Sequence, residues 1–280
     1  MENKERTTKN KILLGSGLVA VFIVLTVASN AIYNGLFGYG VPVAEGLDTC
    51  NVLGINLHGS LYTYVPTEGS ADDPEEYQNQ YGDAVGSEDI VGQLRQADQD
   101  DQIKAIIVEV DSGGGFPVAG EEISNTIKEL TKPVVAVIRQ SGMSAAYWAI
   151  SSSDKIFASR NSDVGSIGVT SSYLENTSKD TKYIQLSSGK FKDTGSPDKP
   201  LSEEERNLLL RDIKITHENF IEDIAQNRKL SVESVKAIAD GSSVLGERAK
   251  ALGLIDEIGS WATAEKYLEE TIGEKPEICW

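Results

Sequence analysis

Residues 105–115 read AIIVEVDSGGG, and this stretch decides the fold. Its first part, Ala105–Val110, is an apolar run typical of a buried strand, and the polar and glycine residues after it are a turn signal. A helical pattern follows at Val118–Leu130, and a second apolar run, PVVAVI, lies at Pro133–Ile138. Strands that alternate with helices predict βαβ units and therefore an α/β fold with largely parallel strands.

Similar patterns extend this alternation in both directions along the chain. The longest helical segment, Leu201–Asn227, begins near Ser202 and has Glu205 three residues later, which predicts a capping box. The remaining expected strands are Val52–Leu57, Lys155–Ala158 and Tyr183–Leu186, and the remaining expected helices are Ile90–Ala97, Ser144–Ser153, Ser231–Ile238, Glu247–Leu252 and Trp261–Tyr267.

The composition is that of a globular protein with an acidic surface. A chain of 280 residues can bury a core, and a net charge of -17 argues against nucleic acid as a partner, because nucleic acid requires a positive surface. The two cysteines, Cys50 and Cys279, form no CxxC or Cys/His cluster, so we expect neither a metal nor a cofactor. They could pair in an oxidising compartment, but the sequence does not fix their geometry and we do not expect a disulfide.

The N-terminal region has the pattern of a membrane anchor. Basic side chains are frequent in residues 1–11, and residues 12–32 carry no charge over a length that just spans a bilayer as a helix. No Lys or Arg occurs between Ile12 and Leu94, so the positive-inside rule predicts a cytoplasmic N-terminus and an exported main domain at the cell membrane. The alternative is a cleaved signal peptide with its cleavage site at residues 29–31.

The remainder is interpreted as one domain with short extensions. Residues 33–50 are expected to be a linker, residues 51–270 the single domain, and residues 271–280 a C-terminal tail. A polar, acidic stretch at residues 67–89 is typical of a solvated loop.

Two turns follow predicted strands, which is where α/β folds gather ligands. In the first, Asp111–Gly115, the glycines allow backbone N–H groups to point outward. These groups could form an oxyanion hole, hold a phosphate or belong to a plain turn. The pattern matches neither a P-loop nor a dinucleotide-binding turn.

The second turn is SGMSAAYW at Ser141–Trp148, which places Ser144 among small residues between a strand and a helix. Such a position exposes a nucleophilic hydroxyl at a helix N-terminus, although Ser144 could also merely cap the helix. A nucleophile needs a base, and neither His58 nor His217 comes with an orienting Asp motif.

A lysine can replace histidine as the base when its amine is neutral, which burial in an apolar site favours. Free lysine has a pKa of about 10.4, so roughly three pKa units must be removed. Lys190 and Lys192 lie in a Gly- and Ser-rich loop after a predicted strand, and the residues alone do not choose between them.

Taken together, these segments resemble the signal peptide peptidase A family in its short, single-unit form. The order and spacing of the motifs carry the resemblance, which extends from about Val52 to Tyr267. The matching motifs are VDSGGG at Val110–Gly115, GMSAAYW at Gly142–Trp148, VGSIGV at Val164–Val169, SGKFKDTGSP at Ser188–Pro197 and ERAKALGLIDEIG at Glu247–Gly259.

The resemblance implies a ClpP/crotonase-type fold and a serine endopeptidase with a Ser–Lys dyad. It implies Ser144 as nucleophile, Lys192 as base and Ser166 as the residue that orients the base. Backbone N–H groups of Gly114, Gly115 and Ala145 would form the oxyanion hole. The implied substrates are remnant signal peptides or other exported and membrane peptides, and the implied assembly is a homo-oligomer that contacts lipid through its anchor.

The chain departs from the family pattern beside the expected site. Gly113 stands where the family has proline, Ala145 and Ala146 replace two glycines, and Phe116 and Pro117 follow the glycine turn. These changes affect the shape of the substrate pocket. Three alternatives remain: a ClpP-class membrane protease with a stomatin-like partner, a non-catalytic scaffold of the same fold, and an acyl-CoA enzyme, which an exported location disfavours.

Overall fold

The computed structural model describes residues 50–66, 74–176, 186 and 188–280. The expected basic tail, the anchor or signal segment at residues 12–32, the linker up to residue 49 and most of the strand expected at Tyr183–Leu186 lie outside this part. Within the described ranges, no helix is long and apolar enough to cross a membrane. Membrane anchoring therefore stays a prediction.

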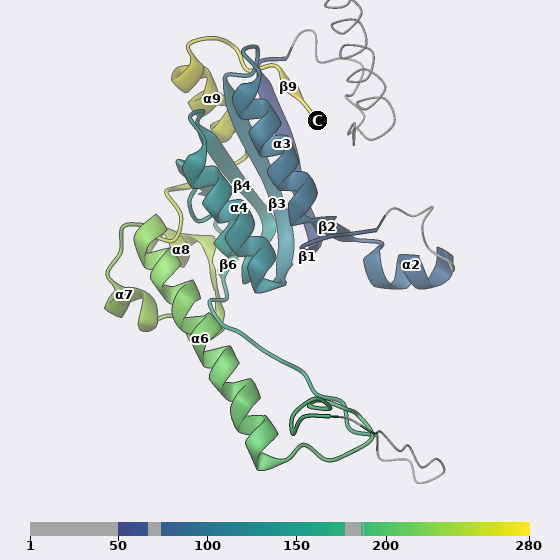
Figure 1. Cartoon of the computed structure of the whole chain (residues 1–280). Coiled ribbons are helices and arrows are strands. Elements are labelled where there is room, and N and C mark those ends of the chain that lie inside the picture. The colour runs from purple at the N-terminus through teal and green to yellow at the C-terminus, as the bar shows by residue number, and fades with distance from the viewer. Residues whose placement is uncertain (1–49, 67–73, 177–185, 187) are drawn as a thin grey trace, which may run out of the picture. The chain divides into compact units, whose positions relative to one another are not determined.

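The centre of the fold is a parallel sheet, as the alternating pattern predicts. Its main path runs in the order β2-β1-β3-β4-β5-β8, and each neighbouring pair along it is parallel. Figure 1 shows β1, β3 and β4 side by side in this sheet. The strands of this path are β1 Val52–Tyr62, β2 Ala84–Gly86, β3 Ala105–Gly115, β4 Val134–Met143, β5 Lys155–Ala158 and β8 Glu257–Ile258. The α/β class is thus confirmed.

Helices connect these strands, and short strands extend the sheet. The helices are α2 Pro74–Tyr81, α3 Ser87–Gln99, α4 Pro117–Glu129, α5 Ala145–Ile150, α6 Glu203–Asn227, α7 Val232–Lys236, α8 Gly246–Ala251 and α9 Trp261–Ile272. The additional strands are β6 Asp163–Gly165, β7 Ser243–Leu245 and β9 Ile278–Cys279. Helix α2 and the two- and three-residue strands were not expected from the sequence, because so few residues show no periodicity.

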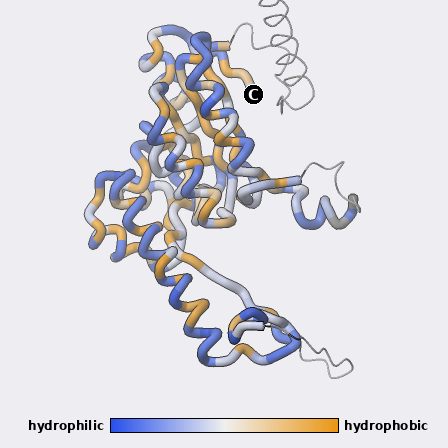
Figure 2. The backbone as a smooth tube through the Cα atoms, in the orientation of Figure 1, coloured by the Kyte–Doolittle hydropathy of each residue, from blue (hydrophilic) through white to orange (hydrophobic). Residues whose placement is uncertain are grey.

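The sheet is buried on both faces near the starts of its strands. On one face, Ile107 and Val135 pack with Ala264 and Leu268 of α9. The neighbouring residue Ile106 points the opposite way, as alternation along a strand requires, and is also fully buried. Figure 1 shows α3 and α4 lying across this second face. Figure 2 shows hydrophobic residues in the strands, which lie between α9 on one face and α3 and α4 on the other.

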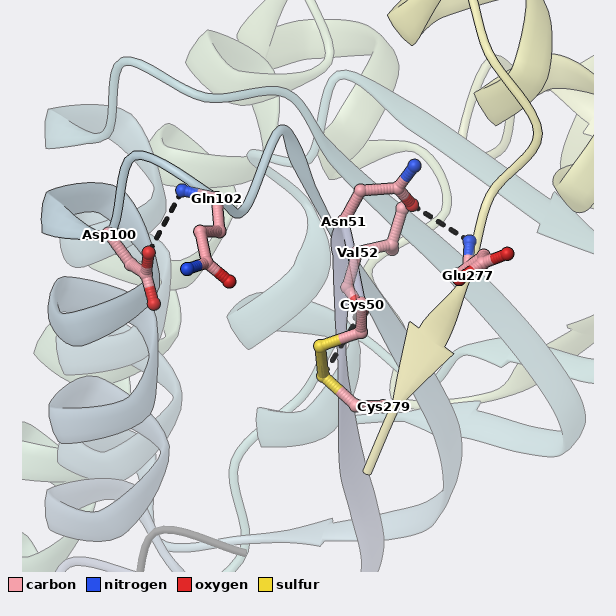
Figure 3. The surroundings of a disulfide bond; sticks show 7 residues. All are labelled: Cys50, Asn51, Val52, Asp100, Gln102, Glu277 and Cys279. Carbon is pink, nitrogen blue, oxygen red and sulfur yellow. Dashed lines mark hydrogen bonds between the residues drawn. A yellow bond between two sulfur atoms is a disulfide. The ribbon is translucent and has the colours of Figure 1, made fainter. Parts of the chain in front are cut away.

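The C-terminal residues belong to the fold, which corrects two expectations. Cys50 and Cys279 form a disulfide although we expected none (Figure 3). Strand β9 pairs in parallel with the start of β1, and the Glu277 N–H donates to Asn51 Oδ1 over 2.8 Å. Residues 271–280 are therefore not a free tail. The register of β9 against β1 brings the two cysteines together, and no local sequence pattern reports that register.

Helix α6 is attached to the rest of the domain near its C-terminal end. The capping box is confirmed, because Ser202 Oγ accepts from the Glu205 N–H and Glu205 Oε2 accepts from the Ser202 N–H. Phe220 stacks on Trp148 of α5 with ring centroids 4.5 Å apart, and Trp148 Nε1 donates to Asp223 over 2.9 Å. None of the α6 residues between Glu205 and Phe220 is buried.

Candidate active site

The predicted site lies where β3, β4 and β6 end side by side. Strand β4 pairs with β3 as far as Gly142, and its last residues, 141–143, pair with β6. The Ser144 N–H then donates to the carbonyl of Gly165 in β6 over 2.7 Å. The nucleophile turn is therefore held between two strands.

Ser144 has a backbone conformation that is unusual for a residue with a side chain. Its φ is 52° and its ψ is -129°, at the junction of β4 and α5. Such conformations cost on the order of 1–3 kcal/mol and occur often at functional sites. Although Ser144 occupies the N-cap position, its side chain makes no capping hydrogen bond. Capping therefore does not explain the serine, and its hydroxyl is not engaged at the helix N-terminus.

The glycine turn of β3 lies against Ser144. Gly114 has a φ of 108°, and a Cβ added there would lie 2.7 Å from the Ser144 Cβ, so this position requires glycine. The Gly114 N–H donates to Ser112 Oγ over 3.1 Å, and Ser112 Oγ donates to the Gly59 carbonyl over 2.5 Å. Because the Gly114 N–H is engaged within its own turn, Gly115 and Ala145 are better placed as oxyanion donors.

A small cavity of about 90 Å³ opens beside Ser144. Gly115 and Ala145 line it, together with residues 168–170 after β6. Its deeper wall includes Trp148 and Phe220, which are almost completely buried. The cavity therefore offers an apolar wall next to a hydroxyl and two candidate backbone donors.

Ser166 lies near the nucleophile turn but does not contact the expected base. It follows Gly165, the acceptor for the Ser144 N–H, and has a φ of 48°. Its hydroxyl donates to the Gly241 carbonyl over 2.8 Å. Its proposed role in orienting a lysine is therefore not seen within one chain.

Within the described residues, no hydrogen bond or ion pair joins Lys192 to Ser144. Lys192 is exposed and lies in a loop that is bonded to the first turn of α6, where Lys190 contacts Glu204 over 2.7 Å and Lys199 contacts Glu205 over 2.6 Å. Phe220, which lines the cavity beside Ser144, lies fifteen residues further along α6. At a rise of 1.5 Å per residue, Glu205 and Phe220 are about 22 Å apart along the axis of α6.

Figure 1 shows the N-terminal half of α6 and the loop attached to it extending away from the sheet. The Ser–Lys dyad therefore stays a prediction.

Ion pairs attach the loop that carries Lys192 to the start of α6. Lys199 lies between Asp193 and Glu205, at 3.0 Å and 2.6 Å. The hydrogen bond from Lys199 and those from Ser202 lower the pKa of Glu205 to about 2, and the same carboxylates raise the pKa of Lys199. These contacts join the loop to α6 and not to the sheet.

The two histidines do not line the cavity. His58 Nε2 lies 3.2 Å from Glu109, which also pairs with Arg139 across the sheet. His217 is half-buried, and within the described part of the chain its Nε2 atom is shielded from solvent and has no hydrogen-bond partner. In the same part of the chain, no cluster of three or more His, Cys, Asp or Glu side chains is arranged to hold a metal ion.

Three residues of this region were not singled out from the sequence. Phe220 and Asp223 come from α6, and only the packing of α6 on α5 shows that they support the cavity. Asp111 lies inside a quoted motif, but its bond to Ser141 is visible only once β3 and β4 are aligned.

A larger cavity of about 640 Å³ between α3 and α4 contains none of the predicted catalytic residues.

Comparison with known proteins gives consistent matches. The model of Peptidase family S49 matches residues 126–274. MJ0651 of Methanocaldococcus jannaschii, described as a candidate protease, is 35% identical over 192 residues, which are 66% of this chain and 62% of that protein. A candidate signal peptide peptidase SppA of Enterococcus faecium is 32% identical over 60% of this chain and 51% of its own length.

Protease 4 of Haemophilus influenzae is 30% identical over 70% of this chain and 33% of its own length. The chain thus spans less than two thirds of each of these relatives. Among solved structures, a point mutant of ClpP1 from Listeria monocytogenes is similar with a TM-score of 0.46 and 16% identity, covering 74% of this chain and 91% of that one.

Proposed function

Because the chain belongs to Peptidase family S49, we propose that it is a serine endopeptidase with Ser144 as its nucleophile. The observation that carries the proposal is the geometry of Ser144. Its backbone is strained, its hydroxyl makes no capping hydrogen bond, and it lies beside a cavity with an apolar wall. The backbone N–H groups of Gly115 and Ala145 are the proposed oxyanion donors, since the Gly114 N–H is engaged with Ser112. Such donors stabilise the charge that develops when a hydroxyl attacks a carbonyl.

In the proposed reaction, a neutral lysine removes the Ser144 proton as Oγ attacks the peptide carbonyl carbon. The tetrahedral intermediate collapses to an acyl-enzyme, and the lysine gives its proton to the leaving amine. Water then attacks the ester with the lysine again as base, which releases the acid product and frees Ser144.

The base in this scheme is Lys192, supplied by a neighbouring copy of the chain. Lys192 is exposed and lies in a loop bonded to the first turn of α6, and within the described residues no hydrogen bond or ion pair joins it to Ser144. Docking of the loop at the end of α6 onto the Ser144 turn of a second copy would supply both proximity and burial. Homo-oligomerisation is then a condition for activity, and Ser166 would contact the incoming lysine.

The proposed substrates are apolar peptides at or near a membrane, including remnant signal peptides. The apolar wall of the cavity supports an apolar side chain next to the cleaved bond. The disulfide between Cys50 and Cys279 supports an exported location, because disulfides persist in oxidising compartments. The chain would be held at the membrane by residues 12–32, with its N-terminus in the cytoplasm.

The test is cleavage of casein and of fluorogenic apolar peptides by the full chain and by Ser144→Ala, Lys192→Ala and Lys190→Ala. We expect Ser144→Ala and Lys192→Ala to lose at least about 10³-fold in kcat while they remain folded and assembled. Lys190→Ala is the matched control in the same loop and should retain activity. Full activity of Lys192→Ala would exclude it as the base, and an inert wild-type oligomer would support the scaffold alternative.

The substrate preference has its own test at Phe220. Phe220→Ala should enlarge the cavity and raise kcat/KM for peptides with an aromatic residue before the cleaved bond by about tenfold relative to those with alanine. Phe220→Leu keeps most of the volume and serves as the control. An unchanged ratio in Phe220→Ala would mean that this cavity does not bind the side chain before the cleaved bond.

A further inference from the structure

A single carboxylate joins the two turns of the candidate site. Asp111 Oδ1 accepts hydrogen bonds from the backbone N–H and the hydroxyl of Ser141, each over 3.1 Å. Asp111 lies in β3 directly before the glycine turn, and Ser141 lies in β4 three residues before Ser144. The contact therefore links the segment with the proposed oxyanion donor Gly115 to the segment with the nucleophile.

The link lies at a break in the backbone pairing of these strands. Val110 pairs with Ile138, and the next pair is Ser112 with Gly142, so one residue of β3 faces three residues of β4. At such a bulge the regular backbone pairing is locally disrupted, and here it resumes only at Ser112 and Gly142. The side chain of Asp111 fills this gap, since it bonds the Ser141 N–H that the irregular pairing leaves over.

The offset between these strands determines the catalytic geometry. Beyond the bulge, β3 contributes Gly115, whereas β4 leads into Ser144 and Ala145. Oxyanion donors act at about 2.7–3.1 Å from the oxygen they stabilise. A displacement of about 1 Å can reduce the rate by roughly 10²-fold. The relative position of the two turns is therefore a sensitive quantity, and Asp111 is the side chain that spans them.

We propose that Asp111 is a positioning residue of the peptidase reaction, which holds the oxyanion turn and the nucleophile turn in register through Ser141. This inference rests on the proposed function. Asp111 does not line the cavity beside Ser144, so its effect should fall on the transition state rather than on substrate binding. Both hydrogen bonds go to one oxygen of Asp111, so an amide oxygen at the same position can accept them, and the geometry matters more than the charge.

The first experiment measures kcat and KM of Asp111→Ala, Asp111→Asn and Ser141→Ala in the full chain, against Ser144→Ala as the inactive reference. Asp111→Ala should lower kcat by about 10- to 100-fold with KM unchanged within about twofold. Asp111→Asn should restore kcat to near the wild-type value. Ser141→Ala removes one of the two bonds and should lie between them.

Glu109→Ala is the matched control. Glu109 lies two residues earlier on the same strand and also bridges β3 to β4, through Arg139, but it precedes the bulge. Its removal should leave kcat unchanged. If Asp111→Ala has the same kcat as Glu109→Ala, or if Asp111→Asn is as impaired as Asp111→Ala, the proposal is wrong.

The second experiment needs no turnover and separates this inference from the proposed function. Hydrogen exchange of the backbone amides in residues 112–116 and 142–148 should become at least about tenfold faster in Asp111→Ala and stay as in wild type in Asp111→Asn and Glu109→Ala. Unchanged exchange in Asp111→Ala overturns the inference, even in an active enzyme. If wild type cleaves no peptide, the proposed function fails, and the exchange pattern alone decides the role of Asp111. If Asp111→Ala does not fold, Ser141→Ala replaces it in both the kinetic and the hydrogen-exchange measurements.

Discussion

The turn that carries Ser144 and the loop that carries Lys192 are built in opposite ways. The first lies at the ends of strands whose earlier residues are buried, and its backbone bonds reach β6. The second is exposed and bonded mainly to the first turn of α6 through lysine–carboxylate pairs. The proposed nucleophile is thus held by the sheet, whereas the proposed base would need another surface to become buried.

This difference assigns separate tasks to the two regions. In the proposed enzyme, the ends of the strands would fix the positions of the hydroxyl and the oxyanion donors. The loop at the start of α6 would reach a neighbouring copy of the chain, so that the proposed site would be complete only in an assembly.

The largest expected effect tests directly whether Ser144 and Lys192 act together from two different copies of the chain. Ser144→Ala and Lys192→Ala chains, each inactive alone, should regain activity when they are unfolded together and refolded as mixed oligomers. If the dyad forms between copies, roughly a quarter of the adjacent pairs in a random mixture carry both intact residues. Peptide cleavage by the mixture is the measurement. A mixture of Ser144→Ala with the Ser144→Ala, Lys192→Ala double variant is the control, and a mixture no more active than its components would place the base within the same chain.

A second effect concerns the global stability of the sheet region. Cys279→Ser should lower the free energy of unfolding by about 2–5 kcal/mol, because the disulfide closes a very long loop between the first and the last strand. Urea unfolding with and without reductant measures this. Reductant should destabilise wild type and leave Cys279→Ser unchanged, and an insensitive wild type would contradict the pairing.

A smaller effect tests whether the backbone of the Ser144 turn is strained. Ser144→Gly should be more stable to unfolding than Ser144→Ala by about 1 kcal/mol, because glycine adopts the φ of 52° without strain. Thermal and urea unfolding of these two inactive variants give the difference. Equal stability would show that the turn stores no strain in solution.

The smallest effect is confined to the loop. The pKa of Glu205 lies at about 2, below its usual 4.5, so its charged form stabilises the folded state above pH 4.5, and this contribution is lost as the pH falls towards 2. Glu205→Gln should therefore speed amide exchange in residues 188–205 at pH 7, with little effect on the sheet. The difference from wild type should shrink between pH 4.5 and 2, and a difference that persists at pH 2 would contradict the ionic origin.

Most of the fold was predictable because its signals are local. The run Ala105–Val110 and the run Pro133–Ile138 read as strands from their own residues, and Ser202 with Glu205 marked the start of α6. The strand–turn–helix position of Ser144 followed from the same local pattern. The minor strands escaped prediction because two or three residues adopt β structure only when a neighbouring strand is already in place.

The sequence by itself determined the α/β class, the family resemblance and the candidate residues, because periodicity and motif order are properties of neighbouring positions. Only the tertiary structure decided that Cys50 meets Cys279, that Asp111 reaches Ser141 across a bulge, and that the loop with Lys192 is bonded to the first turn of α6. Each of these depends on strand register or on the length and docking of α6. Register and docking are set by the packing of segments distant in the chain, and a pattern of adjacent residues does not encode them.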